Sequence, residues 1–180
     1  MRIRIVAGEL GGRFLASPGK VSTHPMSERA RSAIFSMLNS SVKDVRVLDA
    51  FAGTGALGIE ALSRGASETI FIESDRVVAK VIQENVDLLG LSEKSIVINT
   101  TVNNWLNTSD TDEFDLIFAD PPYHRPQFST IHKLFGLLKV GGIMILSHSG
   151  RGGTPDKTGI VVVDNRSYAN ACITFYRRVE

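Results

Sequence analysis

The segment of this sequence best suited to chemistry is Asp120-Pro121-Pro122-Tyr123, which follows an apolar run at 114–119. Two consecutive prolines restrict the backbone and remove two N–H donors, so the loop presents hydrogen-bond acceptors. The Asp120 carboxylate and the Pro121 carbonyl can accept the two hydrogens of a planar amino group, and Tyr123 can stack on the ring that bears it. These residue types indicate chemistry on an amino nitrogen.

The reaction that this segment suits best is alkylation of such a nitrogen. The lone pair of the amino group is delocalised into the neighbouring ring, which makes the group a poor nucleophile. Acceptors for its two hydrogens turn the nitrogen toward tetrahedral geometry and aim the lone pair at an incoming methyl carbon, so catalysis consists mostly of orientation. A base must be extruded from its helix or loop to be reached. We therefore expect direct in-line methyl transfer.

A second motif, VRVLDAFAGTGALG at 45–58, places glycines directly after an apolar strand. Gly53, Gly55 and Gly58 fit the spacing G-x-G-x-x-G that is typical of dinucleotide sites. Asp49, four residues before Gly53, would repel a pyrophosphate, whereas it would attract the sulfonium and ammonium groups of S-adenosylmethionine. The charge pattern therefore favours S-adenosylmethionine over NAD as the cofactor.

The next two apolar runs also end in polar side chains that suit this cofactor. Glu73 closes its run twenty residues after Gly53, where an acidic side chain can accept hydrogen bonds from both ribose hydroxyls. The following run ends at Asn99, before Thr100 and Thr101. In nucleotide-binding α/β folds, the end of this strand usually faces the adenine. We expect these strand ends to share one pocket with the catalytic segment.

Short β-branched runs alternate with helical runs from residue 45 onward, which is typical of βαβ units and a parallel sheet. Gly65, Gly90 and Gly141 each follow a helical run, where a left-handed cap is expected. Two closely spaced strands near the C-terminus predict an antiparallel last strand. The pattern predicts an α/β, Rossmann-like fold with a mostly parallel seven-stranded sheet. The expected strands and helices of the alternating part are 45–50, 56–64, 69–74, 76–89, 95–99, 114–120, 128–139 and 143–149.

Residues 1–44 lack this alternation, and we expect them to form a small extension of strand, turn and helix, packed on a core of residues 45–180 within a single structural unit. The expected helix, from about residue 27 to 38, gathers its apolar side chains on one face. Arg29 and Arg31 then point elsewhere, toward solvent or a ligand.

Charge is distributed unevenly along the chain. The net charge is +5 for residues 1–46, −6 for 47–147 and +2 for 148–180. A basic flank beside an acidic body is compatible with a polyanion-binding appendage on a catalytic core.

Several classes of protein are disfavoured by the composition. No apolar run approaches the roughly 18 residues of a membrane span, and the first residues lack the apolar core of a signal peptide. The single cysteine, Cys172, cannot form an internal disulfide and follows no proline, which disfavours cysteine-based carbon methylation. No Cys/His cluster has metal-ligand spacing. We expect a cytoplasmic protein without metal, and a monomer because nothing indicates an obligate dimer.

With these residues in hand, the chain resembles the bacterial 16S ribosomal RNA guanine-N2 methyltransferase family of the RsmD type. The resemblance implies a class I methyltransferase fold that methylates the 2-amino group of guanine 966, on an assembled or partly assembled small subunit. It is carried by the segments RIVAGELGGRFL, HPMSERARSAIFSML, VLDAFAGTGALGIEALSRGA, FIESD, DPPY and ITFYRR. The implied catalytic residues are Asp120, Pro121, Pro122 and Tyr123; the implied cofactor-binding residues are Asp49, Phe51, Gly53, Gly55, Glu73 and Thr101; the RNA-contact candidates are Arg13, Arg29 and Arg31.

The sequence departs from the family pattern at His24-Pro25-Met26, at Thr101 and at Tyr168-Ala169. The first departure removes a guanidinium and a hydroxyl, which bears on RNA or substrate-loop contacts. From the residues alone, an amino methyltransferase acting on adenine in DNA or on a protein glutamine stays open, as does a nucleotide-binding module or a catalytically silent RNA chaperone.

Overall fold

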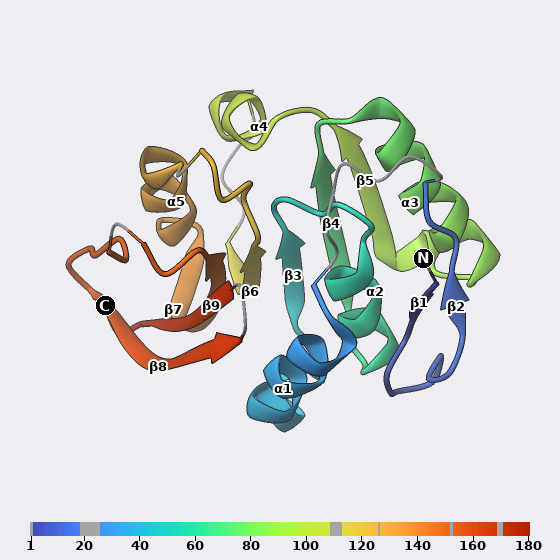
Figure 1. The fold of residues 1–180 in the computed structure, drawn as a ribbon, viewed down its shortest axis with the longest axis horizontal. Helices are drawn as coiled ribbons and strands as arrows, with labels where there is room; N and C mark the ends of the chain where they lie inside the picture. The colour runs from blue at the N-terminus through green and yellow to red at the C-terminus, as the bar shows by residue number, and fades with distance from the viewer. Residues whose placement is uncertain (1, 19–25, 109–112, 126, 152, 169–170) are drawn as a thin grey trace.

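The structure is a computed structural model that describes residues 2–18, 26–108, 113–125, 127–151, 153–168 and 171–180. Its centre is a seven-stranded sheet with the strand order β5-β4-β3-β6-β7-β9-β8. In Figure 1, β5, β4, β3 and β6 follow one another from right to left, and the last three strands lie beyond β6 on the left. The strands are β3 (Arg46–Asp49), β4 (Glu68–Glu73), β5 (Ser95–Asn99), β6 (Phe114–Ala119), β7 (Leu138–His148), β8 (Ile160–Tyr168) and β9 (Ala171–Arg178).

Strand directions confirm the expected fold class. The first five strands of the sheet pair in parallel, and β9 is antiparallel to both of its neighbours. The last strand of the chain therefore lies between β7 and β8, and β8 forms the edge. Central strands such as β6 (FDLIFA) read as continuous apolar runs because both of their faces are buried.

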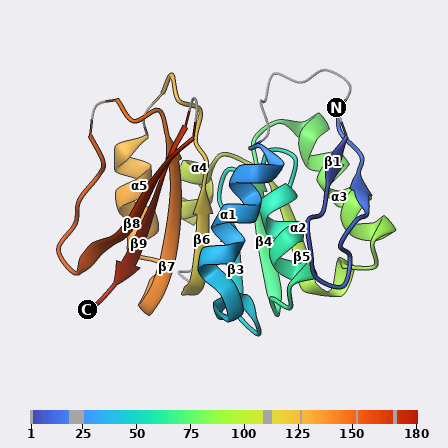
Figure 2. The same ribbon diagram turned by 60° about the horizontal axis from the view of Figure 1, so that its bottom comes forward.

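Helices cover the two faces of the sheet, as Figure 2 shows. One apolar cluster lies under α1, α2 and α3, and the other lies under α4 and α5. Side-chain caps start two of these helices: Ser27 accepts from the Ala30 N–H, and Asp75 accepts from the N–H groups of Val77 and Val78. The helices are α1 (Glu28–Leu38), α2 (Ala56–Ser63), α3 (Arg76–Leu88), α4 (Val102–Thr108) and α5 (Phe128–Phe135), with the 3₁₀ turns η1 (Asn39–Val42) and η2 (Ser92–Lys94).

The N-terminal residues form a separate antiparallel pair, β1 (Ile3–Arg4) with β2 (Phe14–Leu15). This pair is anchored to α2 by Glu60, a fully buried carboxylate that accepts from the backbone N–H groups of Val6 and Ala7. A buried carboxylate is tolerated when its acceptor sites are filled in this way. The anchor fixes the N-terminal segment beside the C-terminal half of α2, where Leu10 also donates to the Ser63 hydroxyl.

Three details differ from the pattern read in the sequence. A second short strand, β2, follows the Gly-rich turn; the helix expected over 128–139 ends at Phe135, and β7 begins already at Leu138. Gly65 and Gly90 follow α2 and α3 with positive φ as predicted, but Gly141 lies inside β7. There it adjoins an irregularity in the β6–β7 register, where a Cβ on Gly142 would approach the Phe114 carbonyl to 3.1 Å. Gly141 and Gly142 therefore permit an irregularity within a strand, and they do not cap a helix.

Within the described ranges, no helix combines the length and apolar character that a membrane crossing requires.

Candidate active site

A cavity of about 700 Å³ opens at the carboxyl ends of the parallel strands. It lies where the chain leaves β3 between its neighbours β4 and β6, the place at which ligands bind in open α/β sheets. Its volume lies in the range of small-molecule and cofactor sites. The lining residues are Met26, Arg31, Ala50, Phe51, Ala52, Gly53, Thr54, Ala56, Leu57, Ile72, Glu73, Ser74, Asp75, Thr100, Thr101, Val102, Asp120, Pro121, Pro122, Tyr123, His124 and Gln127.

The glycine loop has two parts with different tasks. Gly53 and Gly55 adopt φ of 52° and 74°, conformations that favour glycine, and a Cβ on Gly53 would meet no atom within 4 Å. Backbone is therefore open to a ligand at Gly53. At Gly58, by contrast, a Cβ would lie 2.3 Å from Phe71 Cε1, so this glycine permits α2 to pack on β4.

Glu73 joins the glycine loop to the start of α3. Its Oε2 accepts from the Gly53 N–H at 2.8 Å, and its Oε1 accepts from the Asp75 N–H at 2.8 Å. A carboxylate offers about four acceptor positions, so Glu73 retains acceptor capacity toward the cavity that it lines. This geometry suits the ribose contact expected from the sequence.

Asp49 lies behind the cavity wall and, as the sequence suggested, beside the N-terminus of α2. Its side chain is 2% exposed and does not line the cavity, while Ala50 does. Its Oδ2 accepts from the Gly58 N–H at 3.0 Å. Burial raises the pKa of Asp49 to about 8; the Gly58 hydrogen bond opposes this rise, and the negative charges of Asp120 and Glu73 add to it. A cationic ligand in the cavity would stabilise the ionised form.

The catalytic segment, which follows β6, forms another part of the cavity wall. Asp120 is half-buried, Pro121 is buried, and Tyr123 is 41% exposed at the mouth of the cavity. Burial raises the pKa of the Asp120 carboxyl, and a hydrogen bond from the Ser147 side chain opposes that rise. The structure thus brings the predicted acceptor and the predicted stacking ring to the cavity that the glycine loop also lines.

Two further predicted cofactor residues, Phe51 and Thr101, also line the cavity, with Thr100 and Val102 beside them. The Thr101 hydroxyl accepts from the Asn104 N–H at 3.2 Å and so begins α4. Gly55 does not line the cavity, and its positive φ precedes the first turn of α2.

Sequence reasoning missed Ser147, which ends the apolar run of β7 and bonds to Tyr123. The signal was a small polar residue at the carboxyl end of a buried strand. Gln127 was likewise missed as a lining residue because it comes from a loop outside the motifs. Met26, which belongs to a segment that the sequence linked to RNA or substrate-loop contacts, does line the cavity.

The RNA-contact candidates divide into two groups. Arg13 and Arg29 are exposed, whereas Arg31 is only 3% exposed and lines the cavity, so of the two places expected for it, solvent or a ligand, only solvent is ruled out. Arg31 donates from Nη1 to the Met26 carbonyl at 3.0 Å and from Nη2 to the Arg4 carbonyl at 2.6 Å. It therefore ties β1 to the lead-in of α1 beside the cavity. His24 and Pro25 lie outside the described residues.

This arrangement predicts that Arg31→Ala destabilises the fold. Two partly buried carbonyls would lose their donors, and we expect the free energy of unfolding to fall by about 2 to 4 kcal/mol in urea titrations. Arg29→Ala, two residues away and exposed, is the matched control and should change stability by less than about 0.5 kcal/mol. Equal effects of the two substitutions would contradict the structural role of Arg31.

The donor set fits S-adenosylmethionine better than it fits a dinucleotide or a metal ion. Glu73 and Asp120 line the cavity, Asp49 lies behind it, and Arg31 already bonds to two carbonyls. Such a site favours a cation over a pyrophosphate. In the described part of the chain, no group of three or more His, Cys, Asp or Glu residues is arranged to hold a metal.

Fold and site together define a class I methyltransferase, the class whose methyl donor is S-adenosylmethionine. The defining features are the sheet order, the glycine loop after β3, the acid that ends β4, and the Asp-Pro-Pro-Tyr segment after β6.

Similarity to known proteins identifies the family within this class to which the chain belongs. The family described as Conserved hypothetical protein 95 matches residues 3–177. Ribosomal RNA small subunit methyltransferase D of Escherichia coli is 36% identical over 124 residues, which cover 69% of this chain and 62% of that relative. Bacillus subtilis YlbH is 29% identical, covering 98% of this chain and 99% of the relative. The solved structure of Escherichia coli yhhF has a TM-score of 0.89 at 29% identity and covers 100% of this chain and 99% of its own. The chain belongs to this family, the RsmD family.

Proposed function

We propose that this protein transfers a methyl group from S-adenosylmethionine to the 2-amino group of a guanine in 16S ribosomal RNA, at the family position, guanine 966. The observation that carries the proposal is the placement of Asp120-Pro121-Pro122-Tyr123 in one cavity with the glycine loop and Glu73. The family relatives named as small-subunit ribosomal RNA methyltransferases support the choice of RNA.

The residues of the cavity suggest where each part of the cofactor lies. Thr100, Thr101 and Val102 would face the adenine, Glu73 would accept from the ribose hydroxyls, and the open backbone at Gly53 would border the methionine part. When bound, the cofactor supplies an electrophilic methyl carbon on a positively charged sulfur.

Asp120 and Pro121 would then hold the amino group of the guanine. The Asp120 carboxylate accepts one hydrogen and the Pro121 carbonyl accepts the other, so that the nitrogen lone pair points at the methyl donor. Tyr123, exposed at the mouth, would stack on the extruded base. The new carbon–nitrogen bond would form as the carbon–sulfur bond of the donor breaks, so the positive charge passes from sulfur to nitrogen. The nearby Asp120 carboxylate would stabilise this charge until the extra proton leaves the nitrogen for solvent.

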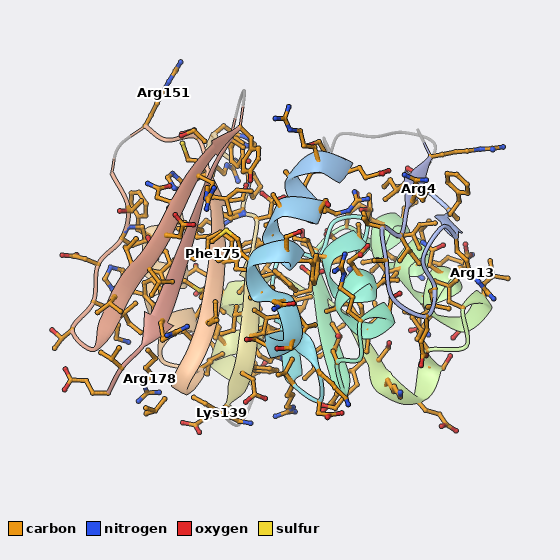
Figure 3. The ribbon with its side chains drawn as sticks, turned by 90° about the horizontal axis from the view of Figure 1, so that it is seen from below. Arg4, Arg13, Lys139, Arg151, Phe175 and Arg178 are labelled. Atoms are coloured by element: carbon orange, nitrogen blue, oxygen red, sulfur yellow. The ribbon has the colours of Figure 1, made fainter. Side chains whose placement is uncertain are left out.

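RNA would approach the end of the sheet at which the cavity opens, where the parallel strands have their carboxyl ends. Figure 3 shows Arg151 and Arg4 near this end of the molecule, and Lys139 and Arg178 near the opposite end, where the parallel strands begin. Arg29, in the first turn of α1, is exposed next to the lining residue Met26. Phosphate contacts by such arginines position RNA without reading its sequence.

We predict that Arg29→Ala and Arg13→Ala each weaken RNA binding and leave cofactor binding unchanged. Each lost phosphate contact should lower the slope of log K against log salt by about one. Lys94→Ala is the control, because Lys94 is exposed just before β5, at the amino end of the strands. Filter binding across a salt series measures the slopes. Identical slopes for Arg29→Ala and Lys94→Ala would remove Arg29 from the RNA interface.

The substrate class is tested by offering labelled S-adenosylmethionine with four acceptors. These are small subunits and naked 16S RNA from a strain lacking this protein, double-stranded DNA, and a glutamine-containing peptide. We expect label in the RNA of the subunits or in the naked RNA. Label in DNA or peptide, with none in RNA, would contradict the proposed function.

A further inference from the structure

Ser147 ends the buried part of β7 directly beside the catalytic segment. In the parallel pair of β6 and β7, Ala119 lies opposite Leu146, so Asp120 and Ser147 leave adjacent strands side by side. The Ser147 side chain is 1% exposed. A hydroxyl at this depth requires hydrogen-bond partners, and both of its partners belong to the catalytic segment.

The first partner is the Tyr123 hydroxyl, 2.6 Å from Ser147 Oγ, and the second is the Asp120 side chain. A serine hydroxyl has one hydrogen. The ionised Asp120 carboxylate can only accept, so in that state the Ser147 hydrogen is donated to Asp120. Ser147 Oγ must then accept the hydrogen of the Tyr123 hydroxyl. The result is a directed chain from the Tyr123 phenol through Ser147 to the Asp120 carboxylate.

We propose that Ser147 is a positioning residue that holds the Asp120 carboxylate and the Tyr123 ring in register with each other. The inference rests on the proposed function, because these two groups are there assigned to one substrate base. Pro121 and Pro122 stiffen the backbone between them but do not orient either side chain. Tyr123 is 41% exposed, so its bond to a buried strand residue fixes a ring that is otherwise free to rotate.

The two hydrogen bonds of Ser147, to Tyr123 and to Asp120, are called the Ser147 bridge below. This bridge also affects the ionisation of Asp120. The Ser147 hydrogen bond lowers the pKa of Asp120, which burial raises. The titratable groups that face this carboxyl are Asp49 at the end of β3 and Tyr123 in its own segment. Without the donor, the pKa of Asp120 moves upward, so a larger fraction is neutral near pH 7 and cannot accept the amino hydrogen.

The direct test is Ser147→Ala, assayed by single turnover on RNA across a pH series. We expect the rate at neutral pH to fall about 10-fold or more, as for loss of a bond to a charged group. The acid limb of the rate profile should move to higher pH, while the dissociation constant of S-adenosylmethionine stays the same. Ser147→Thr keeps the hydroxyl and should recover most of the rate. Thr69→Val is the control, because Thr69 is buried on β4 near the amino end of the strands and its hydroxyl has no hydrogen-bond partner among the residues that the structure describes.

A double-mutant cycle with Tyr123→Phe tests the bridge itself. Each substitution breaks the same chain, so the double variant should be little slower than Ser147→Ala alone. Effects that multiply in full would overturn the bridging role, as would an unshifted acid limb in Ser147→Ala.

A measurement without substrate separates this inference from the proposed function. In protein labelled with 3-fluorotyrosine, the Tyr123 signal is identified by its loss in Tyr123→Phe. We expect that signal to move toward the exposed-tyrosine position in Ser147→Ala and to stay in place in Thr69→Val. If wild type fails to methylate RNA and the signal moves, the proposed function fails and the bridge stands. A signal that does not move would overturn the bridge.

Discussion

Asp120→Ala is expected to reduce the single-turnover rate of methyl transfer by about 10²- to 10³-fold, the loss that follows removal of one preorganised polar group from an active site. The carboxylate accepts an amino hydrogen in our account, and it stabilises positive charge that develops only as the new bond forms. The loss should therefore fall on the rate, and the dissociation constant of S-adenosylmethionine should be unchanged in calorimetry.

Asp120→Asn provides the matched control for this prediction. The amide keeps the shape and one acceptor oxygen but carries no charge, so its rate should lie between those of wild type and Asp120→Ala. A rate for Asp120→Ala close to that of wild type would refute the catalytic role of Asp120. Loss of cofactor binding in the same variant would instead show that Asp120 binds the cofactor and does not act in methyl transfer.

Asp49→Asn is expected to weaken S-adenosylmethionine binding by about 10-fold or more at pH 8, because a buried charge acts on the cationic cofactor at short range. The pKa of Asp49 is raised to about 8 by burial. Below that pH, wild type must release a proton from Asp49 when the cofactor binds. Its affinity should therefore rise with pH up to about 8, and the affinity of Asp49→Asn should not. Calorimetry in buffers of different ionisation heat measures the proton released.

The same substitution should have the opposite effect on stability. The folded protein holds a proton on Asp49 that the unfolded chain, with a pKa near 3.8, has already lost. Wild type therefore loses stability as pH rises from about 4 to 8, by at most about 1.4 kcal/mol per pH unit. Position 49 does not titrate in Asp49→Asn, so the free energy of unfolding of this variant should rise relative to that of wild type between pH 4 and about 8. Above this range the difference should be constant. A stability difference that does not depend on pH would contradict burial of an ionisable Asp49.

The sequence was sufficient for the parts of the site that depend on local backbone and strand order. Gly53 must adopt a left-handed conformation, Glu73 must end the adjacent strand, and two prolines must follow β6, so their meeting at one edge of a parallel sheet was predictable. Gly141 shows the limit of such reasoning, since a positive φ suits both a helix end and a strand irregularity.

Contacts between distant segments could not be predicted. Arg31 lies at helical spacing from Ile34, Phe35 and Leu38, on the buried face of α1, but its partners, the carbonyls of Arg4 and Met26, come to it from outside the helix. Ser147 stands 27 residues after Asp120, and only the β6–β7 register brings them together. The position of Asp49 behind the cavity wall likewise depends on how α2 packs, since Gly58 of that helix donates to it.

The most direct test of the central claim is to identify the methylated product. Small subunits from a strain lacking this protein are incubated with the protein and S-adenosylmethionine, and the 16S RNA is then digested and mapped by mass spectrometry. Our account predicts N2-methylguanosine at a single site, the family position, and none with Asp120→Ala. Methylation at adenine, or at a ring nitrogen of guanine, would contradict it.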